Sequence, residues 1–420
     1  MRFQRHLSSL LCVVILVSII GCQPALKPFP TNTPTALATS QPTETPTETA
    51  IPSTATPSPT ATSEPFCGNA ASPQTTAPFT NTSKEFAKFE PPDNQVYFGF
   101  AYETQVGAYW GDSRPFMERI CDSVEFELSG KTPSLMWVGS QWGSSFSNVL
   151  GEARRISSAM GPSVTFNVDW HVNFVYTPKD IAAGKSDGYI KQYARDVKNY
   201  GKPLFIQPLC GEFNGNWDTS CSPKVNPDLT SDDFVNAWQR VVDIFRQEGV
   251  TNVAWVWAPA VPLPPASGDW GWDPSWWAYY PGDSYVDWIG AHQDGWGEPN
   301  WIYPLNQFGI DHHKPLMVIF AIRHQLSGRS RAQWINWLAG MFDYFKSHPQ
   351  IKAIIYTNIN WHVGTPDRKD RVFLYDGKVS YVPNANDADR RLIAGGEDIR
   401  KLFSDQIADP RYISILVGEP

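Results

Sequence analysis

Carboxylate, amide and tryptophan side chains recur along the chain at the ends of short apolar runs or immediately after them. Paired carboxyl groups can carry out general acid–base chemistry, in which one donates a proton and the other accepts one. Tryptophan combines a flat apolar face with a polar edge, which suits the C–H faces and hydroxyl groups of sugar rings. The residues concerned are Trp142, Asp169, Trp170, Glu212, Asn214, Trp217, Trp257, Asp294, Trp296 and Trp361. We expect the six tryptophans in this set, together with Asp169 and Asn214, to bind a carbohydrate substrate.

The elements that position these residues alternate between strands and helices. Eight apolar runs predict strands: Val96–Ala101, Ser134–Val138, Val164–Val168, Pro203–Leu209, Val253–Trp257, Val286–Ala291, Pro315–Ala321 and Ala353–Thr357. Their nearly continuous apolar character is typical of parallel strands that are buried on both faces. Between them, one helix is expected over Phe234–Gln247, with Ser231 as its N-cap and Gly249 as its stop.

Strands alternating with helices predict an α/β fold, a (β/α)8 TIM barrel with enlarged loops. A doubly wound parallel sheet is the alternative, although no glycine-rich phosphate or dinucleotide fingerprint follows the early strands. The functional residues of a TIM barrel lie at the carboxyl ends of its strands. The barrel therefore places the residues above on one rim, while Trp255, Trp288 and Trp337 are expected to fill the core.

Motifs at four consecutive strands resemble those of glycoside hydrolase family 26. They are Gly201–Ile206 with Gly211–Trp217, Asn252–Trp257, Tyr285–Gly290, and Lys314–Ile319 followed by Gln333–Ile335. The resemblance covers about residues 95–365. It implies a TIM barrel with a retaining β-glycanase activity, chiefly on β-mannans. It also implies a general acid/base on strand 4 and a nucleophile on strand 7.

The two catalytic positions of this resemblance differ in how well they match. Glu212 stands at the position of the acid/base, within an intact Glu-x-Asn-Gly pattern. The nucleophile position, six residues after Lys314, holds Phe320, and no Asp or Glu occurs between Asp311 and Asp343. A phenyl ring cannot form a glycosyl ester, so strand 7 supplies no nucleophile.

A second catalytic carboxylate would therefore have to come from another strand. Asp294 is the first candidate because strand 6 adjoins strand 7, and Asp169 and Glu103 come next. A separation of about 6.5–9.5 Å from Glu212 would allow inversion through a water molecule.

Three functions stay open at this point. The chain is an active glycosidase on β-mannan or a related β-glycan, a catalytically inactive carbohydrate-binding lipoprotein on the same scaffold, or a surface protein without a glycan ligand. The intact surroundings of Glu212 favour the first, with a polysaccharide or oligosaccharide as partner. The net charge of −8 disfavours nucleic acid as a partner. No cofactor or metal is expected, because there is no CxxC and the histidines are scattered.

The N-terminal segment has the pattern of an export signal. Arg2 and Arg5 precede the apolar run Leu7–Ile20, which is short for a spanning helix of about 20 residues. The ending Ile19-Ile20-Gly21-Cys22 resembles a bacterial lipobox, which implies cleavage before Cys22 and lipidation of its thiol. An uncleaved membrane anchor is the alternative.

The expected domain organisation follows from this signal. Residues 1–21 are a lipoprotein signal peptide, 22–66 a Thr/Pro/Ser-rich linker, and 67–420 the barrel domain. The linker is expected to be extended, because its composition cannot form a core. We expect the protein at the bacterial cell surface or anchored to a membrane outside the cytoplasm, attached through Cys22.

Four further cysteines, Cys67, Cys121, Cys210 and Cys221, are expected to form two disulfides in an exported protein. Three pairings are possible. We favour Cys210–Cys221, which closes a short loop, and Cys67–Cys121, which ties down the start of the domain. The tail from Asp376 onward is expected to add a small hairpin or helix against the barrel.

Overall fold

The protein is described by a computed structural model. The described residues are 67, 87–101, 120–121, 124–161, 163–172, 176–215, 226–261, 275–293, 295, 297–322, 330–358, 371–373, 379–381, 392, 396–414 and 416. The chain divides into two compact units, residues 1–61 and 62–420. The segment 1–66, with its expected signal peptide, Cys22 and linker, lies outside the described residues.

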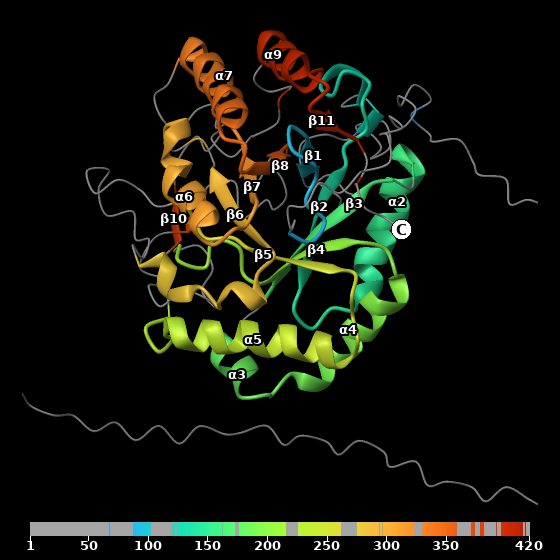
Figure 1. The fold of residues 1–420 in the computed structure, drawn as a ribbon, viewed down its shortest axis with the longest axis vertical. Helices are drawn as coiled ribbons and strands as arrows, with labels where there is room; N and C mark the ends of the chain where they lie inside the picture. The colour runs from blue at the N-terminus through green and yellow to red at the C-terminus, as the bar shows by residue number, and fades with distance from the viewer. Residues whose placement is uncertain are drawn as a thin grey trace, which may run out of the picture. The chain divides into compact units, whose positions relative to one another are not determined.

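Eight parallel strands close into a barrel, which confirms the TIM-barrel prediction and excludes the doubly wound sheet (Figure 1). Each strand pairs with the next in sequence order, and β1 closes the ring by pairing with β8, with Ala101 opposite Thr357. The strands are β1 (Val96–Ala101), β2 (Leu135–Gln141), β3 (Thr165–His171), β4 (Leu204–Leu209), β5 (Val253–Trp257), β6 (Trp288–Gln293), β7 (Leu316–Phe320) and β8 (Ile351–Thr357).

Helices surround the barrel. They are α2 (Phe146–Met160), α3 (Pro178–Ala182), α4 (Asp187–Tyr200), α5 (Ser231–Gln247), α6 (Tyr303–Asp311), α7 (Arg331–Ser347) and α9 (Glu397–Ile407), with 3-10 turns η2 (Trp276–Tyr279), η3 (Asp283–Tyr285) and η4 (Pro299–Ile302). The N-cap of α5 is Thr230, one residue before the predicted Ser231. The Thr230 hydroxyl accepts the Asp233 N–H, and the Asp233 carboxylate accepts the Thr230 N–H, so both groups at this end are satisfied.

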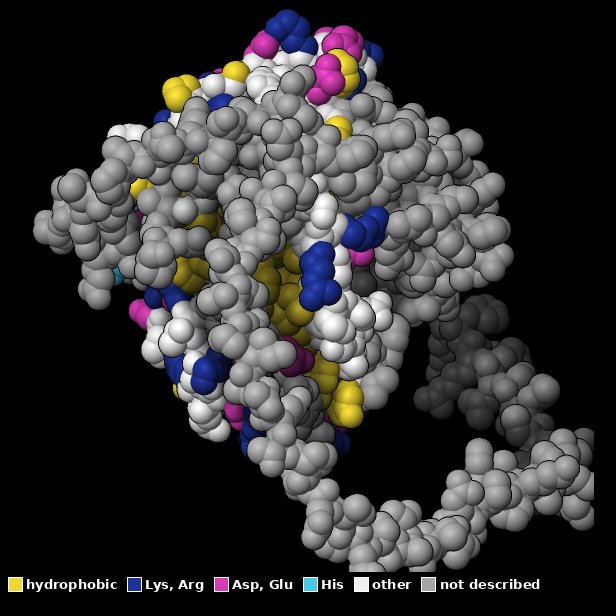
Figure 2. Space-filling model, turned by 90° about the vertical axis from the view of Figure 1, so that its right-hand side faces the viewer, with side chains coloured by type: hydrophobic (Ala, Val, Ile, Leu, Met, Phe, Trp, Pro, Cys, Tyr) yellow, Lys and Arg dark blue, Asp and Glu magenta, His cyan; other side chains and the backbone are white. Residues whose placement is uncertain are grey.

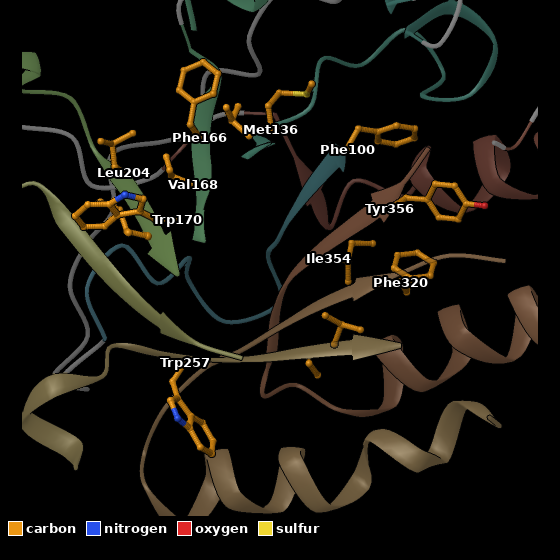
Figure 3. Close-up of a cluster of buried hydrophobic side chains, with 14 of the residues drawn as sticks. Phe100, Met136, Phe166, Val168, Trp170, Leu204, Trp257, Phe320, Ile354 and Tyr356 are labelled. Carbon is orange, nitrogen blue, oxygen red and sulfur yellow. The ribbon is translucent and has the colours of Figure 1, made fainter. Parts of the chain in front are cut away.

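Two apolar clusters fill the domain. The inner cluster lies within the barrel and includes Tyr97, Phe205 and Trp288, whose rings contact one another. The outer cluster lies between the strands and the helices, and Figure 3 shows part of it. Trp255, Trp288 and Trp337 are all buried, as predicted. Each large side chain that is fully buried contributes about 1.5–3 kcal/mol.

The predicted disulfide Cys67–Cys121 is present. It joins residues that are 54 positions apart, and closing such a loop in the unfolded chain corresponds to about 4 kcal/mol of stabilisation. Cys210 is also disulfide-bonded, and its predicted partner Cys221 lies outside the described residues.

The C-terminal tail contains both a hairpin and a helix. The hairpin pairs β9 (Arg371–Phe373) with β10 (Val379–Tyr381), so it begins before the expected residue 376. Helix α9 packs Phe403 against Phe100 and Tyr356 of the barrel. Beyond α9, β11 (Tyr412–Ile413) adds a short parallel strand beside the start of β1. This last pairing had no signal in the sequence.

Charged side chains of both signs gather at the upper end of the view in Figure 2, where α7 and α9 lie in Figure 1. Arg331 of α7 pairs with Asp398 of α9, and Lys401 pairs with Asp405 within α9. Among the described residues, no helix is long and apolar enough to cross a membrane.

Lys131 fastens the tail to the barrel. Its ammonium group donates to the carbonyl oxygens of Ile407 at 2.8 Å, Asp409 at 2.9 Å and Tyr412 at 3.2 Å. Burial is the main cause that lowers the pKa of Lys131, and the charge of Asp409 opposes this effect.

Replacing this ammonium group should therefore weaken the domain. We expect Lys131→Met to lower the free energy of unfolding in urea by about 1–3 kcal/mol, because it leaves partly buried carbonyl groups without their donor. Lys401→Met is the control, since Lys401 is exposed and pairs only across the surface of α9. Equal stability of the two variants would contradict a fastening role for Lys131.

Candidate active site

The accessible part of the barrel interior lies at the carboxyl ends of the strands. On β2 the inward positions Trp137, Gly139 and Gln141 are partly or fully exposed, whereas the residues between them are buried. His171 at the end of β3 and His292 near the end of β6 are also partly exposed. The barrel therefore opens at the end where a TIM barrel carries its functional residues.

Trp137 provides an aromatic surface in this opening. A Cβ atom on Gly139 would lie 3.4 Å from Cη2 of the Trp137 ring, so the ring extends along the inner face of β2 toward the rim. The base of the ring packs on the apolar cluster inside the barrel. An indole that is held on one side and accessible on the other can stack on a sugar ring.

Asp169 and His171 form a hydrogen-bonded pair on the inner face of β3. Asp169 Oδ2 lies 2.7 Å from His171 Nε2, and the exposed fractions of the two side chains are 4% and 35%. Since a carboxylate only accepts, this contact places a proton on Nε2 of the imidazole. Asp169 Oδ1 is buried and has no hydrogen-bond partner within the described part of the chain.

Two buried amides lie beside Asp169. Gln207 on β4 is the register partner of Asp169, and Asn167 is the previous inward residue on β3. Neither amide has a hydrogen-bond partner among the residues that the structure describes. Leaving a buried polar group unpaired costs about 1–3 kcal/mol, so such groups are typical of positions that bind water or a ligand.

Glu212 lies on a tight turn after β4. Leu209 and Glu212 have positive φ angles of 75° and 54°, which side chains of their kind rarely adopt. The Glu212 N–H donates to the carbonyl of Ala258 at 2.7 Å, and its own carbonyl accepts the Gly215 N–H at 2.7 Å. Backbone strain of this kind costs about 1–3 kcal/mol per residue and clusters at functional sites. The Glu212 residue itself is partly exposed.

The neighbours of Glu212 hold the turn in place. Phe213 is fully buried against Phe234 and Trp257. Asn214 is 1% exposed, and its Oδ1 accepts the Ala260 N–H at 2.8 Å. This bond ties Asn214 to the backbone after β5, and its predicted contact with substrate stays a prediction.

Gly211 explains how polar groups from two strands meet beneath the turn. A Cβ atom at this position would lie 3.2 Å from Gln207 Oε1 and 3.3 Å from His292 Nε2. A larger residue would press on both side chains, so the glycine allows the turn to lie directly over them.

Three of the predicted sugar-binding tryptophans lie in the core instead. Trp170 is enclosed between Trp142, at 4.3 Å between ring centroids, and Tyr193, at 4.1 Å. Trp257 packs on Phe213 and donates its indole N–H to a backbone carbonyl. These rings are at most 1% exposed, so they stabilise the layer between barrel and helices (Figure 3).

Phe320 also faces the helices. It is fully buried and contacts Phe345 of α7, Tyr356 of β8 and Phe403 of α9 (Figure 3). The β7 residues that belong to the inner cluster are Met317 and Ile319. The Phe320 side chain therefore lies on the helix side of β7. That position 320 is the vacated nucleophile position stays a prediction.

Several predicted site residues lie outside the described part of the chain. They are Glu103, Trp217, Asp294, Trp296 and Trp361. Conversely, sequence reasoning placed His171 and His292 at the strand ends without giving them a role, and it did not select Trp137 or Gln207, although each of the four occupies an inward position in the period-two alternation of its strand. Within the described ranges, no group of three or more His, Cys, Asp or Glu side chains could hold a metal ion.

The chain has relatives among known proteins. No family model matches the chain. It is 33% identical to Endoglucanase H of Acetivibrio thermocellus over 246 residues, which are 55% of this chain and 25% of that protein. It is 24% identical to Beta-1,3-xylanase of an Alcaligenes species over 204 residues, 44% of this chain and 40% of that protein. The chain thus spans less than half the length of both relatives.

The solved structure of GH26C from a Muricauda species has the same fold. It aligns with a TM-score of 0.50 and 14% identity, over 78% of this chain and 89% of that one. The fold implied by the resemblance to glycoside hydrolase family 26 is therefore confirmed.

The packing role of Trp170 can be tested by its removal. We expect Trp170→Ala to lower the free energy of unfolding by about 3–5 kcal/mol, because it empties a space that Trp142 and Tyr193 cannot fill. Trp277→Ala is the matched control: its ring is 56% exposed, and a loss below about 1 kcal/mol is expected. Urea unfolding measures both, and similar losses would show that Trp170 is not a core residue.

Proposed function

We propose that this chain is a glycoside hydrolase that acts on a β-linked polysaccharide, with Glu212 as the acid that protonates the departing oxygen. The position of Glu212 carries the proposal. Glu212 is a partly exposed residue on a strained turn at the carboxyl end of the barrel. The residue before it, Gly211, lies against Gln207 and His292, and Gln207 is the register partner of Asp169. The names of the relatives, an endoglucanase and a β-1,3-xylanase, support a β-glycan as substrate.

The residues around Glu212 suit a sugar chain. The exposed face of Trp137 can stack on one ring, while Gln141 and His171 can bond to its hydroxyl groups. The buried inner cluster beneath these residues fills the barrel, so the polysaccharide would stay at the rim. A β-mannan or a related β-glycan is the substrate class that we propose.

Binding without hydrolysis is the second candidate function. It is favoured by the inner face of β7, where Met317 and Ile319 supply no carboxylate. A protein of this kind would bind the same glycans through the same rim and release no product.

We also propose that the protein is a lipoprotein held outside the cytoplasm through Cys22. The apolar run before Cys22 and the Thr/Pro/Ser-rich segment after it support this proposal. The lipid would anchor the chain, and the linker would hold the barrel domain away from the membrane where polysaccharide is accessible.

Removal of the acid tests the enzymatic proposal. We expect Glu212→Gln to lower the release of reducing ends from β-mannan, β-glucan or xylan by about 10²–10⁴-fold, since a glutamine cannot protonate the leaving oxygen. Binding of the same polysaccharide, measured by calorimetry, should change much less.

Glu397→Gln makes the same chemical change on an 85% exposed side chain of α9, and it should retain full activity. If the wild-type protein binds one of these polysaccharides and releases nothing, the binding function replaces the enzymatic one.

Cys22→Ser tests the anchor. In bacterial cells fed labelled palmitate, the wild-type chain should carry label and sediment with membranes, and the variant should do neither. Cys12→Ser, within the apolar run, is the control and should behave like the wild type. Equal labelling of all three chains would exclude Cys22 as the lipid attachment site.

A further inference from the structure

We propose that Asp169, oriented by His171, is the second catalytic carboxylate of this site, and that it acts as a general base on water so that hydrolysis inverts the anomeric centre. This inference rests on the proposed glycosidase function. It assigns to β3 the task that the family resemblance assigns to strand 7.

The first argument is the distribution of charge inside the barrel. Among the inward positions of the eight strands as the structure describes them, Asp169 is the sole acidic residue. Its neighbours on the inner face are neutral, namely Gly139 on β2 and Gln207 on β4. Burying 96% of a carboxylate is unfavourable unless its oxygens are hydrogen-bonded, and only one oxygen of Asp169 has such a bond among the described residues.

The second argument is the arrangement of its two oxygens. Oδ2 accepts the hydrogen bond from His171, which fixes the plane of the carboxylate. Oδ1 is buried within the polar layer and has no partner among the described residues. A general base needs a lone pair that no protein group occupies, and Oδ1 meets this condition among the described residues.

The third argument is the distance from Glu212. Asp169 lies on β3, whereas the Glu212 N–H is bonded to Ala258, immediately after β5. Glu212 also follows β4, the neighbour of β3, so its backbone lies between one and two strand spacings from β3, about 5–10 Å. The carboxyl groups of inverting glycosidases are about 6.5–9.5 Å apart, which lies within this range.

The reaction then proceeds in a single step. Glu212 transfers its proton to the glycosidic oxygen as the bond between that oxygen and the anomeric carbon breaks. A water oxygen bonds to the anomeric carbon from the opposite face, and Asp169 Oδ1 accepts a proton from this water. The products are an α-hemiacetal and a free hydroxyl group, and one water molecule is consumed. Bulk water later returns both carboxyl groups to their starting protonation states.

His171 is a positioning residue in this scheme. Its imidazole does not contact the sugar carbon and acts through Asp169. Because its N–H fixes the plane of the carboxylate, His171→Ala should lower kcat with little change in KM. His171→Gln, which keeps an N–H donor, should restore part of kcat.

The deciding experiment follows the anomeric proton by NMR during the first minutes of hydrolysis by the full-length wild-type protein. The substrate is whichever β-oligosaccharide is cleaved. We expect the α-anomer to appear first and to convert slowly to the equilibrium mixture. The β-anomer appearing first would overturn the assignment while leaving the glycosidase function intact. If no polysaccharide is cleaved at all, the proposed function fails and this assignment fails with it.

Matched variants identify the base itself. Asp169→Asn should lower the rate by about 10²–10⁴-fold, whereas Asp405→Asn, an exposed change on α9, should not. Asp169→Ala should be rescued by azide on an aryl β-glycoside, with an α-glycosyl azide as product. In this reaction azide nitrogen bonds to the anomeric carbon while the phenol departs.

Asp294→Asn is the competing variant. If it abolishes hydrolysis and Asp294→Ala is rescued by azide while Asp169→Asn retains most of its activity, Asp294 is the base and the assignment to Asp169 is wrong. Thermal unfolding of each variant distinguishes these outcomes from a loss of folding, and azide rescue of Asp169→Ala requires a folded site.

Discussion

The alternation of side chains along parallel strands that are buried on both faces decides the chemistry of this protein. In a closed barrel, one residue faces the interior and the next faces the helices. Asp169 therefore enters the barrel, while Trp170 beside it is enclosed by aromatic rings. The same rule separates Ile319 from Phe320 on β7. Residues that are adjacent in the sequence thus face opposite sides of the strand and have unrelated roles.

The turn at Glu212 depends on this arrangement as well. Two residues with positive φ angles are held there by groups that do not react: Phe213 in the outer cluster and Asn214 on the backbone of Ala260. The strain of the turn is offset by buried contacts on the helix side of the strands. These contacts hold the backbone of Glu212 at the carboxyl end of the barrel more firmly than a flexible loop would.

Much of the fold was predictable from the sequence because its signals are local. All eight strands appear within a few residues of their predicted bounds, since buried parallel strands are continuous apolar runs. The Cys67–Cys121 disulfide was also predicted. The pairing of β11 with β1 was not, because a strand of two residues carries no pattern of its own.

The site was less predictable, because a residue belongs to it only if its side chain faces the barrel interior. Composition pointed to tryptophans near strand ends, yet Trp142, Trp170 and Trp257 complete the core. Trp137, on an inward position of β2, escaped notice because it lies within a strand. A residue type indicates which chemistry is possible, but only the register of the strand shows on which side that chemistry occurs.

The inner face as a whole has a division that local signals do not reveal. Its lower part is apolar, with Tyr97, Phe205 and Trp288 in mutual contact. Its upper part holds Asp169 and Gln207, which are buried without enough partners to satisfy them. An apolar floor excludes water from below, so the polar groups can be solvated only from the open rim. The groups that a sugar or a water molecule would satisfy are thus kept at the end where Glu212 lies. A carboxylate on β3 can serve that rim without one on β7, because the last inward residues of β2 and β3, Gln141 and His171, are exposed or partly exposed there, as is His292 of β6.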